Sequence, residues 1–149
     1  MCTAQGSDTI TEPAYLDVNV SVSDESCDYS NNGSATVQAS GGTPGYSFQW
    51  LPGASSSSVI SGLTSGSYTV SATDLNGCIT SSVFSITEPA PLAVSFNGIV
   101  DVSCNGGSDG SATASGNGGT PNYSYTWSPG GSNSSMLSNM IAGTYTVDI

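Results

Sequence analysis

The 149-residue sequence contains no lysine, no arginine and no histidine, while it has 11 aspartate and glutamate residues and a formal net charge of -11. Nucleic-acid binding depends on basic side chains that neutralise phosphates, and docking to an anionic membrane surface depends on the same groups. The composition therefore excludes nucleic acid as a partner and argues against docking to an anionic membrane surface. Because the sequence also has no long apolar run, we expect no direct membrane insertion of this segment.

The missing basic residues also remove most of the usual catalytic groups. A Ser-His-Asp arrangement cannot form, and no histidine or lysine is present to activate the many serines. A pair of carboxylates for glycoside hydrolysis is available by residue type, but few acids lie between the aromatic segments where a sugar cleft would form. We therefore expect the chain not to be an enzyme.

The sequence also has little charge of any sign, with 7% charged and 36% hydrophobic residues, which is not the signature of a disordered acidic chain. Long stretches with helical periodicity are missing. Short runs in which Val, Thr, Tyr and Ile alternate with polar residues occur instead at 16–22, 35–39, 46–50, 67–72 and 83–86. Gly, Pro and Asn turns separate them. The pattern predicts an all-β fold of tandem immunoglobulin-like or PKD-like antiparallel β-sandwich repeats.

The amino-acid sequence contains an internal repeat. GGTPGYSFQW at residues 41–50 returns as GGTPNYSYTW at 118–127, and Cys27 returns as Cys104. The offset is 76 residues before this cysteine and 77 after it, because one residue is inserted in the second copy. We expect residues 1–11 to be the final strand of a preceding repeat, 12–88 a complete repeat, and 89–149 a second repeat truncated before its last strand. The chain is then a window onto a longer array.

The aromatic residues of each copy alternate along their strands and so share one face. Such a row stacks sugar rings or fills a sandwich core, and a buried Trp on a central strand favours the core. The residues expected in the structural core are Tyr46, Phe48, Trp50, Tyr68, Val70, Tyr123, Tyr125, Trp127 and Tyr145. The Ser-rich segment 54–58 is expected to be a flexible surface connection.

Carboxylates in turns raise the question of calcium, which prefers hard oxygen ligands. Asp74 and Asn76 in Asp-Leu-Asn-Gly, the acidic cluster at 24–28, and Asp101 with Asp109 in the second copy are the candidates. The full EF-hand spacing is absent. We favour a local role for Asp74 and Asn76 as the hairpin turn before Cys78, with calcium as the alternative and no other cofactor expected.

Four cysteines, Cys2, Cys27, Cys78 and Cys104, show no CxxC spacing, which disfavours zinc and favours disulfides outside the cytoplasm. One arrangement pairs Cys27 with Cys78 inside a repeat and leaves Cys2 and Cys104 to partners beyond the window. The other pairs Cys2 with Cys27 and Cys78 with Cys104, between repeats. We favour the first, although in a seven-strand immunoglobulin-like order the two turns lie at opposite ends.

Taken in their order, these motifs resemble the SprB repeats of gliding-motility adhesins and other very large surface proteins of Bacteroidota. The resemblance rests on a Cys before Gly-Ser-Ala-Thr, on Gly-Gly-Thr-Pro-x-Tyr-Ser-aromatic-x-Trp, on Gly-x-Tyr-Thr-Val, and on Ile-Thr-Glu-Pro. It implies an extracellular, outer-membrane-associated adhesin that is exported by a type IX secretion system. Asp8-Thr9-Ile10 resembles the O-glycosylation signal of this phylum, which makes Thr9 a candidate glycosylation site.

Two functions remain open. The first is a stiff, extended stalk or filament for surface attachment and gliding motility, in which the partners are neighbouring repeats, with surface polysaccharide or other cell-surface and secretion proteins as further candidates. The proline in each Glu-Pro junction fixes φ and limits bending between repeats. The second is a polysaccharide-binding β-sandwich module of a secreted protein.

Overall fold

The computed structural model describes residue 2 and residues 5–149, so residues 1, 3 and 4 of the expected strand at 1–11 lie outside the described part. Residues 5–16 form no strand. The predicted strand at 1–11 stays a prediction, because its partners would belong to a preceding repeat. The described residues form β-strands and no helix, and hence no helix that could cross a membrane.

The chain divides into two compact units. Unit 1 comprises residues 1–24 and 31–87, and unit 2 comprises residues 25–30 and 88–149. This division lies close to the repeat boundary at residues 88 and 89 that the sequence predicts, with the short segment 25–30 assigned to the other unit.

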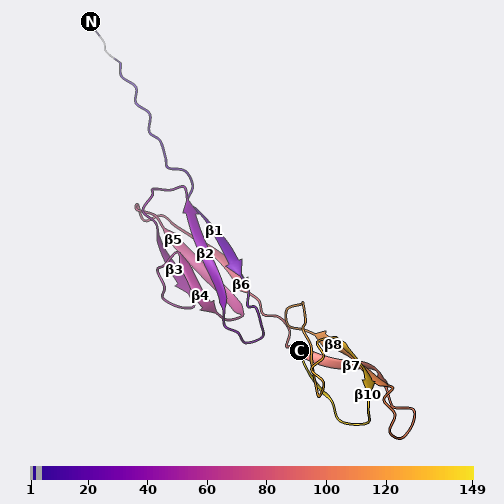
Figure 1. Cartoon of the computed structure of the whole chain (residues 1–149). Helices are drawn as coiled ribbons and strands as arrows, with labels where there is room; N and C mark the ends of the chain where they lie inside the picture. Colours follow the sequence, from indigo (N-terminus) through magenta and orange to yellow (C-terminus); the bar gives the residue numbers. More distant parts are fainter. Residues whose placement is uncertain (1, 3–4) are drawn as a thin grey trace. The chain divides into compact units, whose positions relative to one another are not determined.

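Unit 1 is a sandwich of two three-stranded antiparallel sheets (Figure 1). One sheet has the order β1-β2-β4 and the other the order β3-β5-β6. The strands are β1 (Asp17–Ser23), β2 (Gly33–Ser40), β3 (Ser47–Leu51), β4 (Val59–Leu63), β5 (Gly66–Thr73) and β6 (Ile79–Ile86). This architecture confirms the predicted antiparallel β-sandwich.

The core of unit 1 lies between the two sheets. Ala35 and Val37 of β2 face Trp50 of β3 and Val70 of β5, and all four are at most 2% exposed. This burial follows from the period-2 alternation that the sequence shows, since every second side chain of a strand faces the same side. Phe84 of β6 closes the cluster at one side.

Unit 2 repeats this arrangement with fewer strands. Its strands are β7 (Ala93–Val100), β8 (Gly110–Asn117), β9 (Thr126–Ser128), β10 (Met136–Met140) and β11 (Thr146–Asp148). One sheet has the order β10-β8-β7, and the other contains only β11 and β9. Ala112, Ala114 and Trp127 form the buried cluster. Within the described residues, the second sheet of unit 2 therefore has two strands where unit 1 has three.

The Gly-Gly turn that precedes each aromatic strand is a place where two backbone segments touch. Gly41 has φ of 73°, and a Cβ atom there would overlap the carbonyl oxygen of Tyr15. Gly118 has φ of 71° and meets the carbonyl oxygen of Pro91 in the same way. Only glycine combines this left-handed conformation with so close an approach. The first glycine of each Gly-Gly pair is therefore required because the segment that leads into each unit passes directly against it.

Gly41→Ala should destabilise unit 1 far more than Gly62→Ala, which provides a matched control. Gly62 has the same φ of 73°, but the atom nearest to an added Cβ there is the backbone oxygen of Asn31, 3.9 Å away. We expect about 1 to 2 kcal/mol for Gly62→Ala from backbone strain alone, and more than about 4 kcal/mol for Gly41→Ala. Urea unfolding followed by circular dichroism measures both. Equal losses in the free energy of unfolding would show that the close approach to Tyr15 adds nothing to the cost of the substitution.

Candidate functional site

The aromatic row of β3 faces the core and is not an exposed platform. Trp50 is 1% exposed, and the side chains of Tyr46 and Phe48 are half-buried. The hydroxyl of Tyr46 donates to the carbonyl oxygen of Gly41 at 2.7 Å. A sugar ring has no access to the Trp50 face in this arrangement, because the opposite sheet covers it.

Trp50 also organises the Ser-rich segment that follows it. Its indole Nε1–H donates to the carbonyl oxygen of Ser57 at 2.8 Å, and its backbone N–H donates to the carbonyl of Ser55. In unit 2, Trp127 makes the same indole bond to Ser134, also at 2.8 Å. The segment 54–58 is a mostly exposed connection between β3 and β4, and it is tied to Trp50 because the buried indole N–H requires an acceptor and finds it there.

The two units differ around the equivalent tyrosines, Tyr68 in unit 1 and Tyr145 in unit 2. In unit 1, Phe84 packs edge-on against Trp50 with ring centroids 5.8 Å apart, and it stacks on Tyr68 at 5.7 Å. Tyr68 is 8% exposed. In unit 2, Tyr145 holds the corresponding position and is only half-buried, alongside Val147. Tyr125, Tyr145 and Val147 pack against the Trp127 cluster, while Tyr123 binds the carbonyl of Gly118.

Trp50→Ala should remove the folding transition of unit 1 and leave that of unit 2. Loss of the buried ring and its hydrogen bond costs about 3 to 5 kcal/mol, a large part of the stability of a module of this size. Differential scanning calorimetry of the full chain measures the two transitions. Leu51→Ala is the control, since Leu51 follows Trp50 directly in β3 but its side chain is 55% exposed. A variant that keeps both transitions would contradict the core role of Trp50.

Asp74 lies in the β5–β6 hairpin and is 5% exposed. One carboxylate oxygen accepts the backbone N–H of Thr43 at 2.9 Å, and the other accepts those of Asn76 and Cys78 at 2.9 and 2.8 Å. The side-chain amide of Asn76 donates to the hydroxyl of Thr43 at 2.8 Å. Both oxygens of Asp74 are thus engaged by N–H donors that join the hairpin to the Gly-Gly-Thr-Pro turn. This geometry supports the turn interpretation.

Three of the other acidic candidates also have hydrogen-bond partners. Asp24 accepts the backbone N–H of Thr87 at 2.7 Å, and Asp109 accepts that of Ser103 at 3.0 Å. Glu25 is 4% exposed and accepts the hydroxyl of Ser30. Within residues 2 and 5–149, no three Asp, Glu or Cys residues group closely enough to hold a metal ion. The role of calcium therefore stays a prediction.

Hydrogen bonding sets the ionisation of Asp74. The backbone N–H of Thr43, together with those of Cys78 and Asn76, holds the pKa of its carboxyl below the ordinary value, against an opposing effect of burial. The hydroxyl and backbone N–H of Ser103 lower the pKa of Asp109 in the same way. A depressed pKa in the folded state means that the ionised carboxylate stabilises the fold.

Asp74→Asn should destabilise unit 1 at pH 7, because an amide cannot accept all three N–H bonds. The stabilisation by ionised Asp74 is present above its unfolded-state pKa, about 3.9, and is lost as the pH falls through the lower folded-state value. The gap between variant and wild type should therefore narrow below about pH 4. Urea midpoints at pH 7 and pH 3 measure this. Asp17→Asn, on the exposed side of β1, should show a smaller gap at pH 7.

The positions of the cysteines contradict the predicted disulfide between Cys27 and Cys78. All four are free and exposed. Cys27 lies in the loop that joins β1 to β2, while Cys78 lies in the hairpin that binds Thr43, beyond the opposite end of β2. The eight residues of β2 span about 26 Å at about 3.3 Å each, whereas the Cα atoms of a disulfide lie within about 7 Å. Cys27 and Cys78 of one repeat are therefore too far apart to pair, and a disulfide at Cys27 needs a partner outside its own sandwich.

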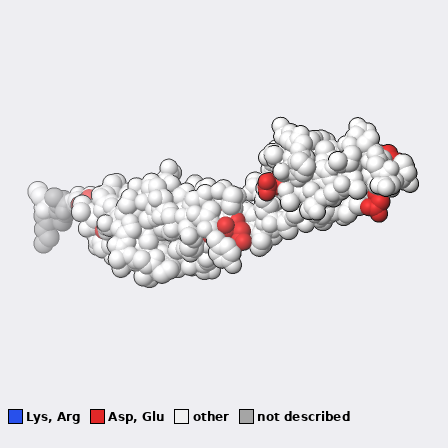
Figure 2. Space-filling model, turned by 60° about the horizontal axis from the view of Figure 1, so that its bottom comes forward, with Lys and Arg blue, Asp and Glu red and all other residues white. Residues whose placement is uncertain are grey.

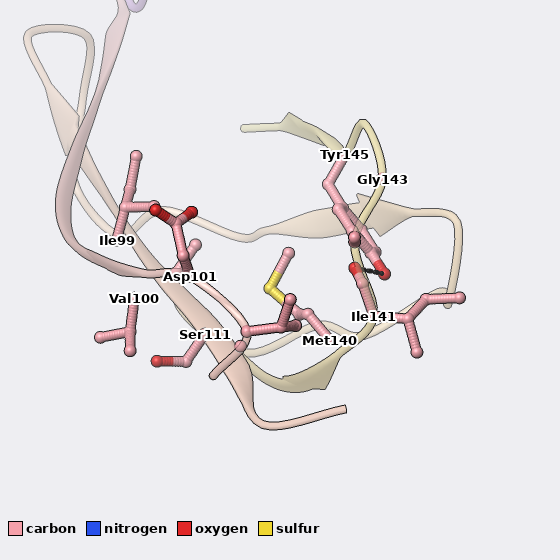
Figure 3. Close-up of a pocket in the computed structure, with 12 residues that line it drawn as sticks. Ile99, Val100, Asp101, Ser111, Met140, Ile141, Gly143 and Tyr145 are labelled. Carbon is pink, nitrogen blue, oxygen red and sulfur yellow. Dashed lines mark hydrogen bonds between the residues drawn. The ribbon is translucent and has the colours of Figure 1, made fainter. Parts of the chain in front are cut away.

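A cavity of about 350 Å³ opens on unit 2, lined by Ile99, Asp101, Met140, Gly143 and Tyr145 among others (Figure 3). Its walls are mainly apolar, and Asp101 is the one carboxylate among the residues that line it. An adjoining cavity of about 230 Å³ reaches Phe96, Trp127 and Tyr145. The sequence did not single out Ile99, because it looks like an ordinary strand residue.

The surface is weakly charged. On the face drawn in Figure 2, Asp and Glu side chains are few and separated by uncharged surface, and the sequence supplies no basic residue. No concentrated acidic site stands out on that face.

The comparisons with known proteins give one family. A family model described as the SprB repeat matches residues 19–55 and 97–132. The two segments cover equivalent parts of the two units, from the first strand past the buried tryptophan. Neither the search of curated proteins nor that of solved structures found a match.

Proposed function

Because this chain belongs to the SprB repeat family, we propose that it is a segment of a long, repetitive cell-surface adhesin whose modules form a stiff, extended stalk for surface attachment and gliding motility. The observation that carries the proposal is the same sandwich core built twice. Trp50 and Trp127 are both 1% exposed, and both donate to a serine carbonyl seven residues further along. A chain that repeats a module of fixed internal geometry gains length without changing its chemistry.

The conformation of each module supports a load-bearing role. In unit 1, five residue pairs are in antiparallel register between β3 and β5, and eight between β5 and β6. Asp74 fixes the hairpin at one end of β5, and Asp24 holds the residue that follows β6 at the other. Glu88-Pro89 follows directly, and its proline restricts the backbone where one repeat leads into the next. These features favour modules that resist extension.

The chemistry of the chain supports a place outside the cell. The surface lacks basic groups, and its acidic residues favour solubility and self-repulsion at low ionic strength. Export by a type IX secretion system and attachment at the outer membrane follow from the family and are part of the proposal. Thr9, which is exposed and whose N–H binds the Asp8 carboxylate at 2.8 Å, is the proposed site of O-glycosylation.

The alternative is a polysaccharide-binding module. It would need an exposed row of aromatic rings, and the rows of both units face their cores. We therefore favour the stalk, with neighbouring repeats as the principal partners of each module.

Antibodies raised against this chain test the proposal on cells that produce the protein. They should label intact cells without permeabilisation and should slow attachment and gliding, because they bind the exposed stalk. Antibodies preincubated with the purified chain are the control. Labelling that requires permeabilised cells would contradict a surface location. A glycan array probed with the purified chain should be blank. A defined sugar hit that Trp50→Phe weakens while both folding transitions remain would support the alternative.

A further inference from the structure

One end of unit 1, beside the β5–β6 hairpin, carries exposed apolar side chains. Tyr15 is 84% exposed, and Leu75 and Ile79 are each 71% exposed. Tyr15, Cys78 and Ile79 line a recess of about 280 Å³, and the N–H of Leu75 donates to the carbonyl oxygen of Thr43 at 3.2 Å. We call these five residues the end surface. It combines apolar contact area with Cys78, which is exposed and free.

Thr43 is hydrogen-bonded to the hairpin through both its backbone and its side chain. Its N–H donates to Asp74 at 2.9 Å, and its hydroxyl oxygen accepts the side-chain amide of Asn76 at 2.8 Å. A hydroxyl has one O–H donor in addition to its acceptor lone pairs. The Thr43 hydroxyl can therefore donate to a further acceptor while the Asn76 bond stays in place.

The equivalent threonine of unit 2 shows what such a hydroxyl binds. Thr120 corresponds to Thr43, and its hydroxyl donates to the carbonyl oxygen of Ser26 at 2.7 Å. Ser26 lies in the segment 25–30, which is part of unit 2, and it directly precedes Cys27. The bond to a Ser-Cys segment uses the donor of this hydroxyl, and the bond to the hairpin uses an acceptor. One threonine can therefore make both bonds at once.

Residues 103–107 repeat the conformation of this Ser-Cys segment. In both segments, the residue three places after the cysteine donates its backbone N–H to the cysteine carbonyl, at 3.2 Å for Cys27 and 2.9 Å for Cys104. The residue two places after the cysteine has a positive φ, 53° in the first segment and 79° in the second. Ser103 precedes Cys104 as Ser26 precedes Cys27. The second segment therefore offers the same carbonyl and the same thiol.

From these contacts we propose that the end surface of unit 1 binds the Ser-Cys segment of another repeat, and that a disulfide between the two cysteines then joins the repeats. The occupant for this chain is residues 103–107 of a second copy. The Thr43 hydroxyl donates to the Ser103 carbonyl, and Cys104 forms the disulfide with Cys78. The proposal does not rest on the stalk function, because it concerns only the contact between two repeats.

The disulfide forms by thiol–disulfide exchange with a small disulfide such as glutathione disulfide. One cysteine thiolate attacks the oxidant and releases one glutathione thiol, and the second cysteine then displaces the other. The two protein thiols lose two protons and two electrons, which the two glutathione thiols carry away. A bond between copies also avoids the separation that prevents Cys27 and Cys78 of one sandwich from pairing.

The segment 25–30 of a second copy is the competing occupant. Its Ser26 carbonyl already accepts the Thr120 hydroxyl, and this bond would have to break before the segment could move to another copy. Residues 103–107 carry no such cost, so we expect them to be the occupant.

Oxidation of the full chain tests the proposal. The reduced chain is incubated with glutathione disulfide, and peptide mass spectrometry identifies the disulfides in each band of a non-reducing gel. We expect a ladder of multimers in which Cys78–Cys104 is the main intermolecular pair. A product that stays monomeric, or the same mixture of pairs that the chain gives when it is unfolded in urea, would overturn the proposal.

Serine variants identify the cysteines that take part. Cys78→Ser and Cys104→Ser should each remove the ladder, whereas Cys2→Ser and Cys27→Ser are the matched controls and should keep it. A ladder that Cys27→Ser removes and Cys104→Ser keeps would identify the segment 25–30 as the occupant and would overturn the assignment of residues 103–107.

Two variants of Thr43 test the docking contact apart from the thiols. Thr43→Val should slow formation of the Cys78–Cys104 pair about two- to tenfold, since one neutral hydrogen bond is lost. Thr43→Ser keeps the O–H and should react as the wild type does. Labelling of Cys78 by a small thiol reagent should be equal in both variants, which separates docking from a change in thiol reactivity. Equal rates of pair formation in the two variants would overturn the assigned contact.

Discussion

The buried tryptophan of each unit is the interaction on which the rest depends. Trp50 brings the two sheets together through Ala35 and Val37, and its single polar atom needs an acceptor inside the fold. The acceptor is a backbone carbonyl of the serine-rich segment, so the same side chain that fills the core also fixes the path from β3 to β4. One large amphipathic ring thus couples the core to a surface connection.

A second set of contacts, from carboxylates to the backbone, stabilises a module that has no basic residues. Ion pairs between side chains are impossible here, so carboxylates serve as acceptors for backbone N–H groups. Asp74 joins the hairpin to the Gly-Gly turn, and Asp24 holds the end of the last strand. Such bonds are strong because the acceptor is charged. The absence of cations leaves the acidic side chains without opposite charges, so copies of the module repel one another at low ionic strength.

The comparison of the two units shows which contacts belong to the last strand. With β6 present, Tyr68 and Val70 are buried; the corresponding Tyr145 and Val147, without such a strand, are half-buried. The remaining core still forms around Trp127. Burial of this tyrosine and this valine in unit 1 therefore depends on β6, whereas the tryptophan core does not.

The sequence by itself determined the β-sandwich class, the tandem repeat, the core role of the tryptophans and the family, because alternation, turn glycines and repetition are local signals. Only the tertiary structure decided that the serine-rich segment is held by an indole, and that Asp74 joins the β5–β6 hairpin to the Gly-Gly turn. These facts depend on which segments the sheets bring together, and sequence spacing does not specify distances between residues far apart in the chain.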